Sequence, residues 1–159
     1  MENQGNMNGN QIPTGQDYLP QLMLDSQICF PLYACARKIV NQYTPYLKPL
    51  GLTYTQYLVF LALWETGEAN VGELGRKLYL DCGTLTPLLK KMQDHGWIER
   101  RRSREDERIV HVTLTESGWA LRDQVREIPM KIGMCIKMEP GEALTLYRLL
   151  RRLMADVPD

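Results

Sequence analysis

The stretch of sequence that decides the fold begins Val71-Gly-Glu-Leu-Gly-Arg-Lys-Leu and continues as Cys82-Gly-Thr-Leu-Thr-Pro-Leu-Leu-Lys-Lys-Met. In its second segment, four apolar residues have the i, i+3, i+4, i+7 spacing of a helix with one buried face: Leu85, Leu88, Leu89 and Met92. The basic run Arg100-Arg-Arg-Ser-Arg-Glu-Asp-Glu-Arg follows, and an alternating apolar segment then ends at Leu114. Two short helices, a tight turn and a β-hairpin are therefore predicted between residues 71 and 118.

This arrangement suits duplex DNA, because the second helix fits the major groove and an arginine-tipped hairpin reaches the backbone and the minor groove. The formal net charge of zero argues against nucleic acid at first, but DNA affinity depends on where charge lies rather than on its sum. Seven of the 19 Lys and Arg residues fall between Lys90 and Arg108. The sequence therefore predicts a DNA-binding protein.

The bulk composition excludes several other classes of protein. At 159 residues, the chain is expected to form one domain, residues 19–159, after a disordered tail, residues 1–18, rich in Asn, Gln and Gly. No apolar run is long enough to cross a bilayer and the N-terminus does not read as a signal peptide, so we expect a cytoplasmic protein with no membrane partner. The four cysteines form no Cys-x-x-Cys pair and only two histidines are present, so we expect neither a metal site nor a cofactor.

The remaining elements are predicted to be mostly helical, which gives a mainly α (α+β) fold. A long helical pattern covers residues 22–50, and Pro31 is expected to kink it or to start a new helical segment. Thr53 is predicted to cap a further helix that ends near Glu65.

Two details of the central stretch are less regular. Pro87 requires its helix either to start late, with Thr84 as the cap, or to bend slightly, and the sequence leaves both alternatives open. Residues 97–101 and 108–114 are predicted to form one small antiparallel hairpin.

The C-terminal part is predicted to contain two helices. Thr115 is expected to cap a helix over residues 116–135 that bends near Pro129. The last helix is predicted to start at Glu139-Pro140.

With these elements in place, residues 22–159 resemble the MarR family of winged-helix repressors, and in particular its organic-hydroperoxide-sensing branch (OhrR). The matching motifs occur in the expected order: Leu24-Asp-Ser-Gln-Ile-Cys-Phe, Tyr33-Ala, Leu52-Thr-Tyr-Thr-Gln-Tyr, Tyr79-Leu-Asp-Cys-Gly-Thr-Leu-Thr-Pro-Leu-Leu-Lys, Asp106-Glu-Arg and Leu114-Thr-Glu-Ser-Gly. The resemblance implies a homodimer held by N- and C-terminal helices, residues 19–52 and 119–159. It also implies a winged helix-turn-helix over residues 53–118, and two such lobes would occupy half-sites of a palindromic operator about 34–36 Å apart.

The resemblance and the residue types together predict the DNA contacts. The expected base and phosphate contacts of the second helix are Thr84, Thr86, Lys90 and Lys91. Alternatively, the threonines only cap the helix and the lysines only keep the surface soluble. Arg108 is expected at the wing tip, in the minor groove, with Asp106 shaping the wing rather than touching DNA. Further candidates for phosphate contacts are Arg100, Arg101, Arg102 and Arg104.

Cys29 is the candidate redox sensor. A lone cysteine on an apolar helical face is usually a small buried hydrophobe, but Tyr33 shares the helical face of Cys29. The resemblance implies that Tyr33 of the same subunit, with Tyr43 and Tyr54 of the other, surrounds the thiol, and phenolic donors stabilise the thiolate that attacks a peroxide. Pro31 departs from the family pattern; if it starts a new helical segment, Cys29 lies near a helix N-terminus, which favours a thiolate.

Cys135 lies where two-cysteine members of this branch carry a resolving cysteine. The resemblance implies that Cys29 is oxidised to a sulfenic acid, which condenses with Cys135 of the other subunit to form a disulfide. The alternative is a buried Cys135, with the sulfenic acid trapped by a small cellular thiol. Cys35 is predicted to lie in the core, and Cys82, where the family usually carries serine, is predicted to be a small residue near the backbone without a redox role.

The predicted function is therefore a repressor that binds double-stranded operator DNA as a reduced dimer and is released when organic hydroperoxides oxidise Cys29. One alternative is a repressor of the same fold that is released by a non-covalent small ligand, with Cys29 inert. A second alternative, a thiol peroxidase, is disfavoured because the chain lacks an Arg or Glu constellation to activate the cysteine, and no enzyme is predicted.

Overall fold

The computed structural model describes residues 19–157, which divide into two compact units, one ending at Lys38 and the other beginning at Ile39. The disordered tail predicted for residues 1–18 lies outside the described residues. The predicted single domain over residues 19–159 stays a prediction.

Helix α1 (Cys29–Leu47) begins later than the sequence pattern predicted. Two short 3-10 helices, η1 (Pro20–Leu22) and η2 (Leu24–Ser26), precede it. Pro31 falls in the first turn of α1, where a backbone N–H would have no partner within the helix, so the proline costs no helical hydrogen bond there. The prediction of a new helical start near Pro31 is confirmed, and Cys29 is the first residue of that helix.

In the second unit, a third 3-10 helix, η3 (Lys48–Leu50), precedes helix α2 (Tyr54–Thr66). The start of α2 is a capping box: the backbone N–H of Gln56 donates to Thr53 Oγ1 over 3.3 Å, and that of Thr53 donates to Gln56 Oε1 over 2.9 Å. The helix is apolar on several sides and is therefore largely buried. The predicted cap at Thr53 is confirmed.

The helix-turn-helix consists of α3 (Val71–Leu78) and α4 (Cys82–Asp94). Tyr79 ends α3 in the left-handed region, with φ of 54°. Helix α4 starts at Cys82 because Asp81 is its N-cap, its Oδ1 accepting the Thr84 N–H over 2.9 Å. The late start with Thr84 as the cap was therefore wrong, and Pro87 lies inside α4.

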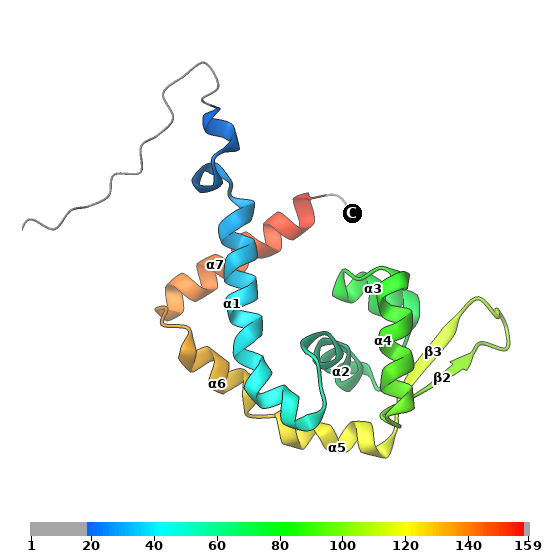
Figure 1. The fold of residues 1–159 in the computed structure, drawn as a ribbon. Coiled ribbons are helices and arrows are strands. Elements are labelled where there is room, and N and C mark those ends of the chain that lie inside the picture. Colours follow the sequence, from blue (N-terminus) through cyan, green and yellow to red (C-terminus); the bar gives the residue numbers. More distant parts are fainter. Residues whose placement is uncertain (1–18, 158–159) are drawn as a thin grey trace, which may run out of the picture. The chain divides into compact units, whose positions relative to one another are not determined.

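The wing is part of a three-stranded antiparallel sheet in the order β1-β3-β2. The hairpin strands β2 (Ile98–Arg102) and β3 (Val110–Leu114) pair from Ile98 opposite Leu114 to Arg102 opposite Val110. Strand β1 (Glu68–Asn70), which the sequence analysis missed, adds to the other edge of β3. Figure 1 shows the hairpin extending beside α4.

The C-terminal helices are α5 (Glu116–Val125), α6 (Ile128–Cys135) and α7 (Pro140–Asp156). Thr115 caps α5 as predicted, with its Oγ1 accepting the Gly118 N–H over 3.2 Å. The predicted single helix over residues 116–135 is instead two helices, because the chain breaks between them and Pro129 falls in the first turn of α6. The start of the last helix at Pro140, after Glu139, is confirmed.

A single apolar core holds the helix-turn-helix and the sheet together. Its fully buried members are Leu47 of α1, Tyr57, Val59, Phe60 and Leu63 of α2, Leu74 of α3, Leu85, Leu89 and Met92 of α4, Ile98 of β2 and Val112 of β3. The stripe predicted in α4 is therefore the one that packs inward, apart from Leu88, which is half-buried. This leaves the opposite side of α4 free for another partner.

Hydrogen bonds join the start of α5 to the short loop between α4 and β2. The hydroxyls of Thr115 and Ser117 both donate to the Gly96 carbonyl, over 2.6 and 2.7 Å, and the Thr115 N–H donates to the Trp97 carbonyl. A Cβ at Gly118 would lie 2.1 Å from that Trp97 oxygen, so only glycine permits this approach.

We predict that Gly118→Ala lowers the free energy of unfolding by about 2–3 kcal/mol, because the new methyl group overlaps backbone that cannot move independently. Gly133→Ala is the matched control. A Cβ there meets nothing within 4 Å, and alanine favours a helix over glycine by roughly 0.5–1 kcal/mol. Urea denaturation at one protein concentration compares the two, and equal effects would contradict the close-approach account.

Candidate functional site

The outer side of α4 carries the residues predicted to read DNA. Thr84, Thr86, Lys90 and Lys91 are all exposed, whereas Leu85 and Leu89 between them are buried. The Thr84 hydroxyl donates to Asp81 Oδ2 and the Thr86 hydroxyl donates to the Cys82 carbonyl, each over 2.7 Å. Both threonine side chains are therefore held in fixed rotamers on the surface of the helix.

Asp81 organises the N-terminus of this helix. Its carboxylate accepts both the N–H and the hydroxyl of Thr84. These hydrogen bonds lower the pKa of Asp81, the side-chain bond from Thr84 having the largest effect. The carboxylate is therefore ionised at neutral pH and holds its partners as an anion.

At the wing tip, Arg108 and Asp106 form a side-on ion pair. Arg108 Nε donates to Asp106 Oδ1 over 3.0 Å and Nη2 donates to Oδ2 over 3.1 Å, while the backbone N–H of Arg108 also donates to Oδ1. These bonds lower the pKa of Asp106 and raise that of Arg108. The Arg108 side chain is still 90% exposed, so one edge of the guanidinium is fixed while its other N–H groups face solvent.

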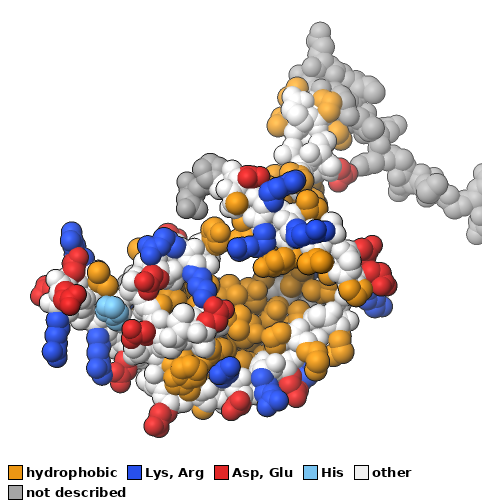
Figure 2. Space-filling model, turned by 180° about the vertical axis from the view of Figure 1, so that it is seen from behind, with side chains coloured by type: hydrophobic (Ala, Val, Ile, Leu, Met, Phe, Trp, Pro, Cys, Tyr) orange, Lys and Arg blue, Asp and Glu red, His pale blue; other side chains and the backbone are white. Residues whose placement is uncertain are grey.

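The other wing arginines differ in their local partners. Arg100 Nε donates to Gln93 Oε1 of α4 over 2.6 Å, which ties the wing to the helix, and Arg101 pairs with Glu99 at 2.6 Å. Among residues 19–157, no hydrogen bond or ion pair from Arg104 is found. Figure 2 shows basic and acidic side chains interleaved over the surface of the wing. Arg104 thus combines exposure with an unpaired charge.

All four cysteines are exposed thiols in the described part of the chain. Cys29 and Cys82 are the first residues of α1 and α4, and Cys135, the last residue of α6, donates from Sγ to the Lys131 carbonyl over 3.4 Å. The core position predicted for Cys35 was wrong, because no buried residue of the core comes from the N-terminal half of α1.

The predicted thiolate-supporting tyrosines fall in two places. In the first unit, the Tyr33 hydroxyl accepts from Arg37 Nη1 over 3.2 Å, and the Arg37 guanidinium lies 5.6 Å from the ring centre. In the second unit, the rings of Tyr43 and Tyr54 lie 4.8 Å apart between centroids. Tyr33 and Cys29 thus belong to one unit, and Tyr43, Tyr54 and Cys135 to the other.

Tyr57 completes the tyrosine cluster, defined here as Tyr43, Tyr54 and Tyr57. Its ring centre lies 5.7 Å from that of Tyr43 and 6.3 Å from that of Tyr54, and the residue is only 2% exposed. Burial, with smaller contributions from Tyr43 and Tyr54, raises the pKa of Tyr57 to about 12. Tyr57 was not among the site residues predicted from the sequence, although its spacing of three from Tyr54 places both on one helical side.

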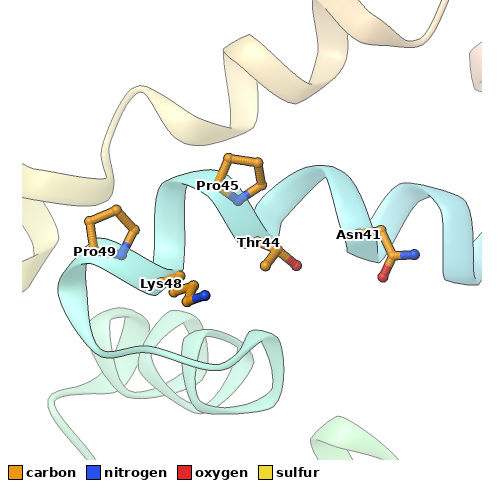
Figure 3. Close-up of a pocket in the computed structure, with 5 residues that line it drawn as sticks. All are labelled: Asn41, Thr44, Pro45, Lys48 and Pro49. Carbon is orange, nitrogen blue, oxygen red and sulfur yellow. The ribbon is translucent and has the colours of Figure 1, made fainter.

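A hollow of about 780 Å³ lies beside the C-terminal end of α1 (Figure 3). It is lined by Asn41, Thr44, Pro45, Lys48 and Pro49, and it contains none of the predicted site residues. Within residues 19–157, no group of three His, Cys, Asp or Glu side chains is placed to hold a metal ion. No helix in that range is long and apolar enough to span a membrane.

Comparison with known proteins gives one family match and several relatives. The sequence model of a family described as transcriptional regulator SarA/Rot matches residues 41–125. The organic hydroperoxide resistance transcriptional regulator of Bacillus subtilis (strain 168) is 45% identical over 137 residues, which cover 83% of this chain and 92% of that protein.

Two solved relatives share the fold. AbfR of Staphylococcus epidermidis, solved in its reduced form bound to DNA, is 34% identical with a TM-score of 0.71 and covers 86% of this chain and 95% of its own. AbfR has also been solved overoxidised and bound to DNA, and with a disulfide formed. A MarR mutant from E. coli complexed with operator DNA is 26% identical, has a TM-score of 0.71 and covers 77% of this chain and 90% of its own. The mainly helical winged helix-turn-helix fold is confirmed.

We predict that the tyrosine cluster makes stability fall with rising pH between about 10 and 12. The raised pKa of Tyr57 means that the unfolded chain loses its phenolic proton first, so the native state is favoured below this window and loses that advantage through it. The ionisation of Tyr57 lowers the free energy of unfolding by at most ~1.4 kcal/mol per pH unit within this window. Denaturation of Tyr57→Phe should show a shallower alkaline loss than the unsubstituted protein, and parallel curves would contradict the prediction.

Proposed function

Because this chain belongs to the MarR and SarZ family of winged-helix transcriptional regulators, we propose that it is a redox-sensing repressor that binds a palindromic operator as a reduced homodimer. It is a transcriptional regulator and not an enzyme. Organic hydroperoxides release it by oxidising Cys29. The observation that carries this proposal is the exposed thiol of Cys29 at the first residue of α1, in a chain 45% identical to an organic hydroperoxide resistance regulator.

In the proposed complex, α4 lies in the major groove and the wing follows the backbone into the minor groove. Thr84 and Thr86 meet base edges, and Lys90 and Lys91 meet phosphates or guanine. Arg108 enters the minor groove with the N–H groups that Asp106 leaves free, where negative potential is strongest. Further phosphate contacts come from Arg100, Arg101 and Arg104. Arg104 can make its contact without first breaking a hydrogen bond or ion pair within the protein, whereas Arg100 and Arg101 each have a local partner.

The homodimer is proposed to form through the terminal helices. The C-terminal helices carry large apolar side chains that are exposed to water in the single chain. They are Met130 and Met134 of α6, and Leu144, Tyr147, Leu149 and Leu153 of α7. Burying such side chains in a twofold interface is favourable. The same symmetry sets two copies of α4 on successive half-sites, about 34–36 Å apart.

The chemical step takes place at the Cys29 sulfur. A helix N-terminus stabilises negative charge, which supports attack by the thiolate form. The thiolate attacks the terminal oxygen of an organic hydroperoxide, the O–O bond breaks, and the alkoxide leaves and takes a proton to become the alcohol. Cys29 is then a sulfenic acid, and the peroxide has been reduced by two electrons.

We propose Cys135 as the resolving thiol. Its sulfur attacks the sulfenic sulfur of Cys29 on the other subunit, an S–S bond forms, and the hydroxyl leaves as water. The exposed position of Cys135 supports access by another chain, and AbfR, which is 35% identical, has been solved with a disulfide formed.

The signal reaches DNA through helix α2. Tyr43 of α1 packs on Tyr54 and Tyr57 of α2, and α2 in turn packs on α3 and α4. A change in α1 on oxidation therefore shifts the element on which the recognition helix rests. When this happens in both subunits, the distance between the two copies of α4 no longer matches the spacing of the half-sites. Packed interfaces commonly switch in this way between two discrete arrangements.

The wing contact predicts that Arg108→Ala weakens binding to an operator duplex and reduces the slope of log K against log [salt] by about 1. Asp106→Ala is the informative partner. Removing an acidic residue near DNA should strengthen binding by charge alone, but loss of the side-on ion pair frees the Arg108 guanidinium, so we expect weaker binding. Fluorescence anisotropy over a salt series measures both, and an Asp106→Ala protein that binds more tightly would refute the shaping role.

The thiol mechanism predicts a covalent dimer on non-reducing gels after cumene hydroperoxide treatment, absent from both Cys29→Ser and Cys135→Ser. Operator release should also be lost in Cys29→Ser. Cys35→Ser and Cys82→Ser are matched controls, because both remove an exposed thiol from a helix and should leave dimer and release unchanged. Release of Cys29→Ser by the peroxide would overturn the redox proposal in favour of another inducer.

A further inference from the structure

Two threonine hydroxyl groups on the outer side of α4 each donate their only proton to a hydrogen bond within the protein. A threonine hydroxyl has one proton to donate and two lone pairs to accept with. Thr84 donates its proton to Asp81 Oδ2 and Thr86 donates its proton to the Cys82 carbonyl, each over 2.7 Å. Both side chains are nevertheless exposed, so their oxygen lone pairs and methyl groups remain available to a partner.

These donations withstand competition from DNA. The Asp81 carboxylate is ionised, and hydrogen bonds to a charged acceptor are roughly twice as strong as neutral ones. A base oxygen or nitrogen is a neutral acceptor, so it cannot match the carboxylate for the Thr84 proton. Thr86 makes the bond to the carbonyl four residues earlier that threonine commonly makes inside a helix, without any change of rotamer.

The major groove contains few groups that can donate to such an oxygen. Adenine offers the N6 amino group and cytosine the N4 amino group, whereas guanine offers only the acceptors N7 and O6, and thymine offers an acceptor and a methyl group. We propose that Thr84 and Thr86 act as hydrogen-bond acceptors that select adenine or cytosine on the contacted strand and do not read guanine. This inference rests on the proposed function, in which α4 is the recognition helix.

The neighbouring residues concentrate base reading on these two oxygens. Gly83, which precedes Thr84, and Pro87, which follows Thr86, are both exposed on α4 and have no polar side-chain atom. Lys90, one turn further along, carries only donors. Lys90 and Lys91 are therefore the donors that α4 offers to guanine, whereas Thr84 and Thr86 offer acceptors to adenine or cytosine.

The experiment selects binding sites from a random duplex library with the reduced full-length protein, and repeats the selection with Thr84→Val and Thr86→Val. Valine keeps the shape and methyl groups of threonine but removes the acceptor. Each variant should lose about 3- to 10-fold of preference at one base pair of each half-site, where the unsubstituted protein prefers adenine or cytosine. Thr84→Ser and Thr86→Ser keep the oxygen and should retain that preference.

Two further arms make the assignment specific. Asp81→Asn keeps a good N-cap but offers an amide donor to Thr84, which releases the threonine proton and should relax only the Thr84 position. Where the base pair at which a valine variant loses its preference is C·G, replacing its guanine with 7-deazaguanine removes the N7 acceptor. Affinity should be unchanged, because the threonine contacts the cytosine amino group. Circular dichroism and thermal midpoints check that each variant is folded.

The outcomes separate this inference from the proposed function. A library that yields no palindromic half-site overturns both. A palindromic half-site whose base preferences are the same in both valine variants overturns the acceptor inference alone. Loss of a guanine preference in either valine variant, or sensitivity to 7-deazaguanine at the affected pair, also overturns it.

Discussion

The close contact between the Gly118 backbone and the Trp97 carbonyl is the constraint on which the DNA-facing surface depends. The Trp97 and Gly96 carbonyls accept hydrogen bonds from Thr115 and Ser117, and Trp64 of α2 donates from Nε1 to the Gly118 carbonyl over 3.1 Å. One short junction therefore connects α2, the end of α4, the wing and α5. Because the wing and α4 share this junction, Arg108 and the two threonines keep a fixed relation to each other, as two grooves of one duplex require.

Charge in this protein is used for orientation more than for attraction. The net charge is zero, and several wing arginines have local partners: Arg100 with Gln93, Arg101 with Glu99 and Arg108 with Asp106. A paired guanidinium gives up part of its long-range pull on DNA but gains a defined direction. The same principle applies to Asp81, which fixes the Thr84 hydroxyl and with it the polarity of a base contact.

Local signals in the sequence predicted most of the fold. Thr53 predicted the N-cap of α2, and the segment from Val71 to Leu78 predicted α3, because caps and apolar spacing act within one or two turns. Strand β1 was missed because it has three residues and exists only by pairing with β3, which is distant in sequence. The sequence left the start of α4 open because Pro87 allowed a late start with Thr84 as the cap, whereas the carboxylate of Asp81 stabilises an earlier one. For the candidate site, residue types could be predicted, but not that Tyr57 joins Tyr43 and Tyr54, which needs two helices to pack.

The account as a whole depends on oxidation at Cys29 being the event that detaches the protein from its operator. The most direct measurement follows both quantities in one sample after limiting cumene hydroperoxide: the fraction of Cys29 oxidised, by peptide mass spectrometry, and the fraction of labelled operator released, by anisotropy. The account predicts that the two fractions rise together while Cys35 and Cys82 stay reduced. Operator release that precedes Cys29 oxidation, or full oxidation with the operator still bound, would contradict it.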